Sequence, residues 1–453
     1  MFKKNFMNPF ENLPINNGPK KEVLDEKWYS SFEKIGAFQD FEYLTGKKEH
    51  REDQKQKFIS GEIENPELDY PELETFDFSS KEQSLLELKR AVITTEPNET
   101  LNQLYRWKIN EKIADLRMLQ ATKNGNDKKF SRYSKFIYGE PDREIFEYTI
   151  SQIKSVVDKQ LFSEDADIKN AAERLNKNLF DALANNANTI FPENFDIPAT
   201  QNKKEEKEYS TEEIRAAFEN FLKEKAVDGW KVVVDICGRF TSLNISQDKK
   251  EINIPSTRRL KETALQELIA HELGTHVMRR EKGEHSKLKL LGLGLDRYLK
   301  GEGGISTYAE QKISGFSDFS GLDGHLAIAL ATGSDGKKRN FREVFEILRD
   351  IYFIKSKKNK EEAWESAENS AWTRCVRTFR GTICKTPGAC LTRDIVYREG
   401  NIAVWNLVKE NSPEVRRFSV GKYDPSNPRH IWILDQLGIT DEDLDSLDKA
   451  SKK

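Results

Sequence analysis

The amino-acid sequence predicts an α+β fold that is mainly helical, with a small β-sheet beside the helix that carries the candidate active site. Three observations lead to this prediction. Amphipathic patterns with helical spacing dominate residues 80–183. β-branched runs gather between residues 230 and 254. An apolar helical run that contains two histidines follows at residues 268–280.

The helices are predicted from apolar residues that recur every three or four positions. An early charged pattern over residues 22–58 is interrupted at Gly46, where a helix is expected to end. Further patterns of this kind predict helices over residues 80–93, 101–121, 144–161, 165–183 and 341–352.

Most of the predicted strands lie close together between residues 230 and 254, and one further strand is predicted near residue 395. Residues 230–237 read WKVVVDIC, a β-branched run typical of a strand. Residues 240–246 and 251–254 flank a short polar QDKK connection, which predicts a hairpin. Much later, residues 395–397 are also predicted to be extended, because they begin with isoleucine and valine.

The helix after the hairpin carries the pattern H-E-x-x-x-H, and Thr263 with Gln266 predicts a capping box at its start. In the common zinc-protease signature the histidines are four apart on one helix face, and the intervening glutamate is the general base. Here His271 and His276 are one residue further apart, so a regular helix would turn them about 140° from each other. Both can reach one metal only if the helix takes up the extra residue, through a π-type turn or a local break between Glu272 and His276.

A catalytic zinc ion needs a third protein ligand and an open position for water. Glu302 is the candidate, because it follows His276 at a distance that allows a second helix to fold back onto the first. The alternative is that Glu302 is a carboxylate of a first helical turn, stabilised by the helix dipole. His285, His325 and His430 are expected to be solvated or structural.

Composition predicts a globular cytoplasmic protein of two or three domains. No apolar run approaches the roughly 18 residues of a membrane span, and the first 21 residues lack the apolar region of a signal peptide. The net charge of −3 gives no case for a nucleic-acid or membrane partner. The cysteines follow no disulfide or zinc spacing and are expected to be free thiols: Cys237, Cys375, Cys384 and Cys390.

Changes in composition and residue pattern along the sequence divide the chain into four predicted parts. Residues 1–20 are rich in asparagine, proline and lysine and are expected to be a disordered N-terminus. Residues 21–200 form a helical N-terminal region, and residues 208–440 form the catalytic domain. Residues 441–453 form a flexible tail.

The site residues belong to a wider pattern. The histidine motif is followed by a Gly-Leu-x-x-Tyr segment ending at Tyr298 and then by Glu302-Gly303. Together with Arg380-Gly381 and with residues 391–400 and 420–422, this resembles the QEGLA-motif proteins, a family that includes the microtubule-associated tyrosine carboxypeptidases. Fainter matches extend the resemblance over residues 60–440. The family's Gln-Glu-Gly-Leu-Ala reads GEGGI at residues 301–305, which places the chain on a divergent branch.

The resemblance implies that His271, His276 and Glu302 bind Zn²⁺ in a zincin-like metallopeptidase core, with Glu272 as the catalytic base. The implied activity is that of a carboxypeptidase that removes a C-terminal tyrosine or other aromatic residue from a protein or peptide. An endopeptidase using the same zinc site is the enzymatic alternative. A non-catalytic zinc-binding regulatory protein is a further alternative, although a purely structural site has no use for Glu272.

A carboxypeptidase also needs a cation for the free C-terminal carboxylate of its substrate, and an arginine fork suits this role best. Arg380 and Arg393 are the candidates because both sit in the family-like motifs. Tyr397 is the candidate hydrogen-bond donor to the developing oxyanion, and an arginine is the alternative. The predicted hairpin would offer a sheet edge along which an extended substrate can bind.

Overall fold

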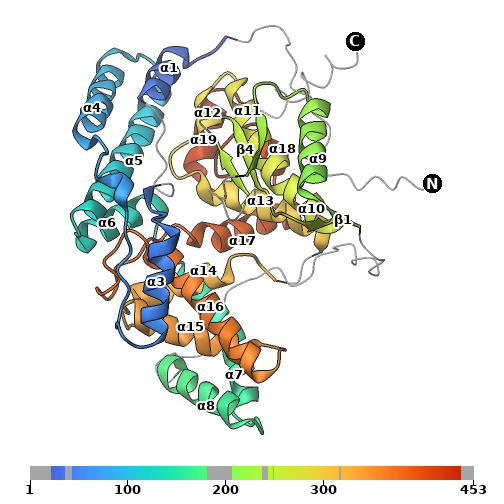
Figure 1. Ribbon diagram of the computed structural model, residues 1–453. Helices are drawn as coiled ribbons and strands as arrows, with labels where there is room; N and C mark the ends of the chain where they lie inside the picture. Colours follow the sequence, from blue (N-terminus) through green and yellow to red (C-terminus); the bar gives the residue numbers. More distant parts are fainter. Residues whose placement is uncertain are drawn as a thin grey trace.

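The computed structural model describes residues 22–35, 43–180, 207–236, 243–247, 249–315 and 318–439. The described part is mainly helical with two small β-sheets, which confirms the predicted α+β class (Figure 1). The predicted disordered N-terminus and flexible tail lie outside the described residues. Within the described residues, no helix is long and apolar enough to cross a membrane.

The N-terminal part is built from helices, as predicted, and polar side chains define where most of them begin. Asp77, Asn98, Asn126, Asp142 and Asp165 each accept a hydrogen bond from a backbone N–H of the first helical turn. The elements are α1 (Glu26–Lys34), α3 (Lys48–Ile59), η1 (Pro71–Leu73), α4 (Phe78–Thr95), α5 (Glu99–Lys123), α6 (Asp127–Tyr138), α7 (Arg143–Gln160), α8 (Ala166–Leu175) and η2 (Asn176–Phe180).

The larger sheet contains the predicted strands. β3 (Asn244–Ser246) pairs antiparallel with β4 (Glu251–Pro255), which confirms the hairpin, and β2 (Lys231–Asp235) pairs parallel with β4 on its other side. β3 is therefore an edge strand in the described part of the chain. A second sheet joins β1 (Glu208–Tyr209) to β5 (Leu260–Lys261). Helix α9 (Thr211–Glu224) packs on the sheet region (Figure 1).

The C-terminal part begins with the candidate metal helix, which is one continuous run of α10 (Glu262–Leu268), η3 (Ile269–Val277) and α11 (Met278–Glu284). Helix α13 packs against both α10 and η3. The remaining elements are α12 (Leu290–Leu293), α13 (Leu299–Ser314), α14 (Leu322–Thr332), α15 (Phe341–Lys355), α16 (Lys360–Phe379), α17 (Ile395–Lys409), α18 (Glu414–Arg417) and α19 (Pro428–Gln436).

Two local predictions are wrong. Residues 395–397 are the first turn of α17 and not a strand, because Ile395 and Val396 are buried in a core shared with α14 and α16, and this packing overrides their β-propensity. The capping box is also absent. Helix α10 starts at Glu262 without a side-chain cap, since pairing of β5 with β1 keeps the chain extended up to Lys261.

The hydrophobic cores cross the predicted boundary between the two main parts of the chain. Phe58 of α3 packs in the same core cluster as Phe341 and Phe345 of α15, with Phe58 and Phe345 in edge-to-face contact. A second cluster joins Trp28 of α1 to Tyr423. The cysteines at 375, 384 and 390 are buried free thiols, as predicted, and Cys237 lies outside the described residues.

Glycines on α13 allow α17 to approach it closely. A Cβ atom on Gly304 would clash with the backbone carbonyl of Gly400, and one on Gly400 would clash with that of Lys300. The added Cβ of Gly303 would lie 3.2 Å from the ring of Tyr397, a tight but less severe contact. The glycines of α13 therefore determine how closely this helix, which carries Glu302, packs against α17.

Gly304→Ala should lower the free energy of unfolding by about 1–3 kcal/mol, because the added methyl group forces two packed backbones apart. Gly303→Ala is the matched control on the same helix. Its contact is milder, and alanine gains about 1 kcal/mol of helix propensity over glycine, so a smaller loss is expected. Urea denaturation of the two variants and the wild type makes the comparison. Equal stability of Gly304→Ala and wild type would contradict this account of the packing.

Candidate metal centre

The H-E-x-x-x-H run lies on a π-helix. Residues Ile269–Val277 form η3, which confirms the predicted π-turn and extends it over the whole run. In a π-helix the backbone hydrogen bonds join residues five apart, so His271 and His276 lie one above the other on the same face. The side chain of Thr275 adds to this pattern by donating a 3.0 Å hydrogen bond from Oγ1 to the carbonyl of Ala270.

The π-helix brings three polar side chains together. The ring centroids of His271 and His276 are 5.0 Å apart, with an interplanar angle of 74°. One ligand atom from each of His271, Glu272 and His276 lies within 4.8 Å of the other two. The opposite face of the helix is held by Leu273 and Val277, which are fully buried in the core cluster that contains β4. All three polar side chains remain half-buried, so a ligand can reach them.

Helix α13 supplies a carboxylate to each histidine. Nδ1 of His276 lies 2.8 Å from Oε1 of Glu302, at hydrogen-bonding geometry. Nδ1 of His271 lies 2.8 Å from Oε1 of Glu310, although this ring nitrogen is not aligned for a hydrogen bond. Glu302 and Glu310 are about two helical turns apart on α13, so they share the face that packs against η3.

Glu302 is buried and ion-paired. Burial alone would raise the pKa of its carboxyl, but the guanidinium of Arg279 and the contact with His276 outweigh burial and lower this pKa to about 2. Arg279 is itself buried and donates a 2.9 Å hydrogen bond to the carbonyl of Tyr423. Among the described residues, Glu302 stays outside the close set of three, so its role as a third metal ligand stays a prediction.

The donor set suits a divalent cation. Two imidazoles with neighbouring carboxylates are the ligand types of catalytic zinc sites. Burial lowers the pKa of His271, but the negative charges of Glu310, Glu272 and Glu302 outweigh it and raise that pKa, so the centre has a negative potential. With Nδ1 of His271 against Glu310, Nε2 is the ring nitrogen that would face a metal. The residues present therefore fit the implied ion.

Comparison with known proteins identifies the family. The chain matches the family described as microtubule-associated tyrosine carboxypeptidase over residues 55–194 and 181–442. The chain belongs to this family. No curated protein and no solved structure matches it. Membership confirms the resemblance seen in the sequence and implies a hydrolase with tyrosine carboxypeptidase-like activity.

The two predicted substrate-binding arginines and the predicted oxyanion donor, Tyr397, lie in three different settings. Arg393 lines a cavity of about 340 Å³ whose wall also includes Arg280 of the metal helix. Arg380 is buried outside the lining of that cavity, and burial together with the neighbouring Arg377 lowers its pKa to about 10. Tyr397 packs over Gly303, next to Glu302, and against the core. The roles of Arg380, Arg393 and Tyr397 stay predictions.

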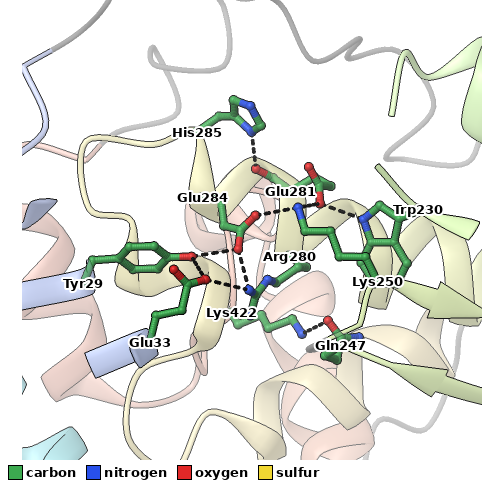
Figure 2. A network of polar contacts seen from close by, with 10 residues as sticks. All are labelled: Tyr29, Glu33, Trp230, Gln247, Lys250, Arg280, Glu281, Glu284, His285 and Lys422. Carbon is green, nitrogen blue, oxygen red and sulfur yellow. Dashed lines mark hydrogen bonds and ion pairs between the residues drawn. The ribbon is translucent and has the colours of Figure 1, made fainter. Parts of the chain in front are cut away.

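A polar network anchors α11, the continuation of the metal helix (Figure 2). Buried Glu281 accepts hydrogen bonds from Trp230 at 2.6 Å and from Lys250 at 2.7 Å. Glu284 accepts hydrogen bonds from Lys250 at 2.9 Å and from the Tyr29 hydroxyl at 2.8 Å, and it pairs with Arg280 at 2.5 Å (Figure 2). The network ties α11 to α1 and to the hairpin, so it fixes the direction of the helix beyond the π-segment.

Three residues near the centre were missed by the sequence reasoning. Glu310 could have been found, because it repeats the position of Glu302 two turns later on the same helix. Arg279 had no such signal, since it sits in an ordinary charged helical turn. Lys422 belongs to a family-like segment, but its sequence position does not show that it is buried beside Tyr298.

Arg279→Met should lower the free energy of unfolding of the metal-free protein by about 3–5 kcal/mol, because it leaves the buried carboxylate of Glu302 without its cation. The double variant Arg279→Met with Glu302→Gln should recover part of this loss, since no unpaired charge remains. Urea denaturation with a chelator present removes any contribution from bound metal. If the single and double variants are equally stable, the ion pair does not account for the burial of Glu302.

Proposed function

We propose that this chain is a zinc-dependent carboxypeptidase that removes a C-terminal tyrosine or another aromatic residue from a protein or peptide. The observation that carries the proposal is the π-helix, which places His271 and His276 on one face with Glu272 between them. This arrangement occurs in a chain of the tyrosine carboxypeptidase family.

The proposed metal ligands are His271, His276 and Glu302. When bound, zinc would supply a Lewis acid that polarises the scissile carbonyl and lowers the pKa of water. The imidazole of His276 is oriented by Glu302, and that of His271 lies against Glu310. Carboxylates in such positions hold a histidine ring in place and increase its basicity. For Glu302, metal ligation would add to its pairing with Arg279.

Glu272 is the proposed general base. Within the described residues, no hydrogen bond or ion pair engages its carboxylate, so it can accept a proton. With a metal on the two histidines, its place between them would put it beside the reacting water, which is the position a general base requires. Glu272 would take the proton from the attacking water and return it to the leaving amine. Tyr397 is proposed as the donor to the oxyanion.

The surrounding fold supports a zincin-like interpretation of the core. The buried isoleucines of β4, Ile252 and Ile254, share a core cluster with Leu273 of the π-helix. Strand β3 then forms the edge of the described sheet. An extended peptide could add to this edge through backbone hydrogen bonds. The substrate proposed on this basis is a protein or peptide with a free C-terminus.

The proposal is tested with paired peptides that end in tyrosine, one with a free C-terminal acid and one amidated, followed by mass spectrometry. We expect release of one residue from the free acid alone, with zinc bound to the protein and activity lost on chelation. Glu272→Gln should keep the zinc and lose turnover, because the ligands remain and the base does not. The folded state of this variant is checked by circular dichroism.

Other outcomes would identify the alternatives. Internal cleavage of both peptides would identify an endopeptidase that uses the same site. A zinc-loaded protein that is inert toward a broad set of peptides would favour a regulatory protein and contradict the proposal. Full activity of Glu272→Gln would show that the proposed mechanism is wrong.

Glu310→Gln should weaken zinc binding by about 10- to 100-fold, the usual effect of removing a carboxylate that supports a metal-binding histidine. Competition with a chromogenic chelator measures the affinity directly, without reference to turnover. Glu262→Gln, an exposed carboxylate at the start of α10, is the control and should leave the affinity unchanged. Unchanged affinity in Glu310→Gln would mean that its contact with His271 does not serve the metal.

A further inference from the structure

A cavity of about 340 Å³ lies near the metal centre, because the negative charge of Glu302 acts to raise the pKa of two of its lining residues, Tyr298 and Lys422. Two of its lining residues sit one helical turn from site residues: Arg280 follows His276 on the metal helix, and Tyr298 precedes Glu302 at the start of α13. Because His276 and Glu302 are in contact, the part of the wall formed by Arg280 and Tyr298 lies about one helical turn from that contact. Its volume falls within the range of about 300–1,000 Å³ that is usual for small-ligand pockets.

Most cations of the cavity wall already have an anionic partner. Lys108 pairs with Glu111 at 2.8 Å, Lys112 pairs with Asp115 at 3.2 Å, and Arg280 pairs with Glu284 at 2.5 Å. These three cations are therefore largely neutralised before any ligand binds.

Lys422 differs from them. Among the described residues, its Nζ donates to Oε1 of Gln247 at 2.9 Å, and no carboxylate lies within 4.0 Å (Figure 2). The side chain is only 3% exposed, so water does little to solvate this ammonium group. Burial lowers its pKa to about 8, against the opposing effect of Glu302, so the amine still carries a proton at neutral pH. A buried cation with only an amide partner gains most from an incoming anion.

The rest of the wall suits an aromatic side chain. The ring of Tyr298 has Nζ of Lys422 at 5.9 Å and Nζ of Lys108 at 5.3 Å from its centroid. Leu293 and Leu299 add apolar surface. Aromatic pairs gain about 0.5–1.5 kcal/mol beyond simple burial, so the wall would favour a ring beside Tyr298.

We propose that this cavity is the subsite for the C-terminal residue of the substrate, with Lys422 as the partner of its free α-carboxylate and Tyr298 beside its aromatic ring. The assignment rests on the proposed function and adds a specificity-determining residue to it. Arg393, on the same wall, is placed to support the carboxylate. Lys422, and not Arg380, is thereby assigned the main role in carboxylate recognition.

The probes are N-acetyl-tyrosine and N-acetyl-tyrosinamide, titrated calorimetrically into the Glu272→Gln protein so that no turnover interferes. The free acid should bind about 10- to 100-fold more tightly than the amide, the range expected for a hydrogen bond to a charged group. Lys422→Met should remove this preference, and Lys422→Arg should restore part of it. Lys282→Met removes another buried lysine, which lies outside the cavity lining, and should keep the preference.

Each contrary result is decisive. Equal binding of acid and amide to the protein with Lys422 intact would overturn the subsite, as would a preference that survives Lys422→Met. Should Lys422→Met fail to fold, Leu299→Trp tests the same cavity by filling it. Weaker binding of the acid in that variant supports the subsite, and unchanged binding overturns it.

Failure of the subsite and failure of the proposed function can be told apart. If the wild type releases tyrosine from free-acid peptides and Lys422→Met does so with an unchanged KM, the subsite is wrong and the carboxypeptidase stands. If N-acetyl-tyrosine binds through Lys422 but no peptide is cleaved, the subsite stands and the proposed function is wrong.

Discussion

The extra residue between the two histidines is the constraint on which the site depends. An α-helix would direct His271 and His276 to different sides, so the local backbone has to adopt π-type hydrogen bonding. Such backbone is rare, and the surrounding packing has to maintain it. The packing is visible on the apolar face, where Leu273 and Val277 are buried in a core cluster with residues of α9 and the sheet. This cluster therefore stabilises the uncommon conformation of the metal helix.

Helix α13 completes this arrangement from the other side. Its two carboxylates face the two histidines, and its glycines allow close contact with α17. The position of the carboxylates depends on the glycines, because a carboxylate can orient an imidazole only if its helix is held in position to within a few tenths of an ångström. The sequence GEGGI joins them in one turn, with Glu302 directed to the metal helix and Gly304 against α17. The divergence from the family's usual motif thus keeps the charge of Glu302, and one of the divergent residues, Gly304, is the one that the close packing against α17 requires.

The sequence predicted what depends on local pattern and missed what depends on packing. The π-turn followed from the spacing of His271 and His276 alone, and the hairpin followed from the polar connection between two β-branched runs. Residues 395–397 were predicted wrongly, because nothing local shows that a core of other helices buries Ile395. Lys422 was recognised only as part of a motif. Its importance comes from its surroundings in the described part of the chain, where it contacts an amide and no carboxylate, and such surroundings have no sequence signal.

The charges of the two adjoining sites have opposite sign. Three carboxylates raise the pKa of His271, which makes the histidine side negative and favourable to a cation. One turn away, the cavity wall carries a buried ammonium group whose described neighbours leave it without an ion pair. Two buried charges of opposite sign would normally neutralise each other, yet Arg279 lies against Glu302 and satisfies that carboxylate instead. By pairing with Glu302, Arg279 leaves Lys422 available to an anion from outside, and under the proposed function this separation would make the end of a peptide chain a better ligand than its middle.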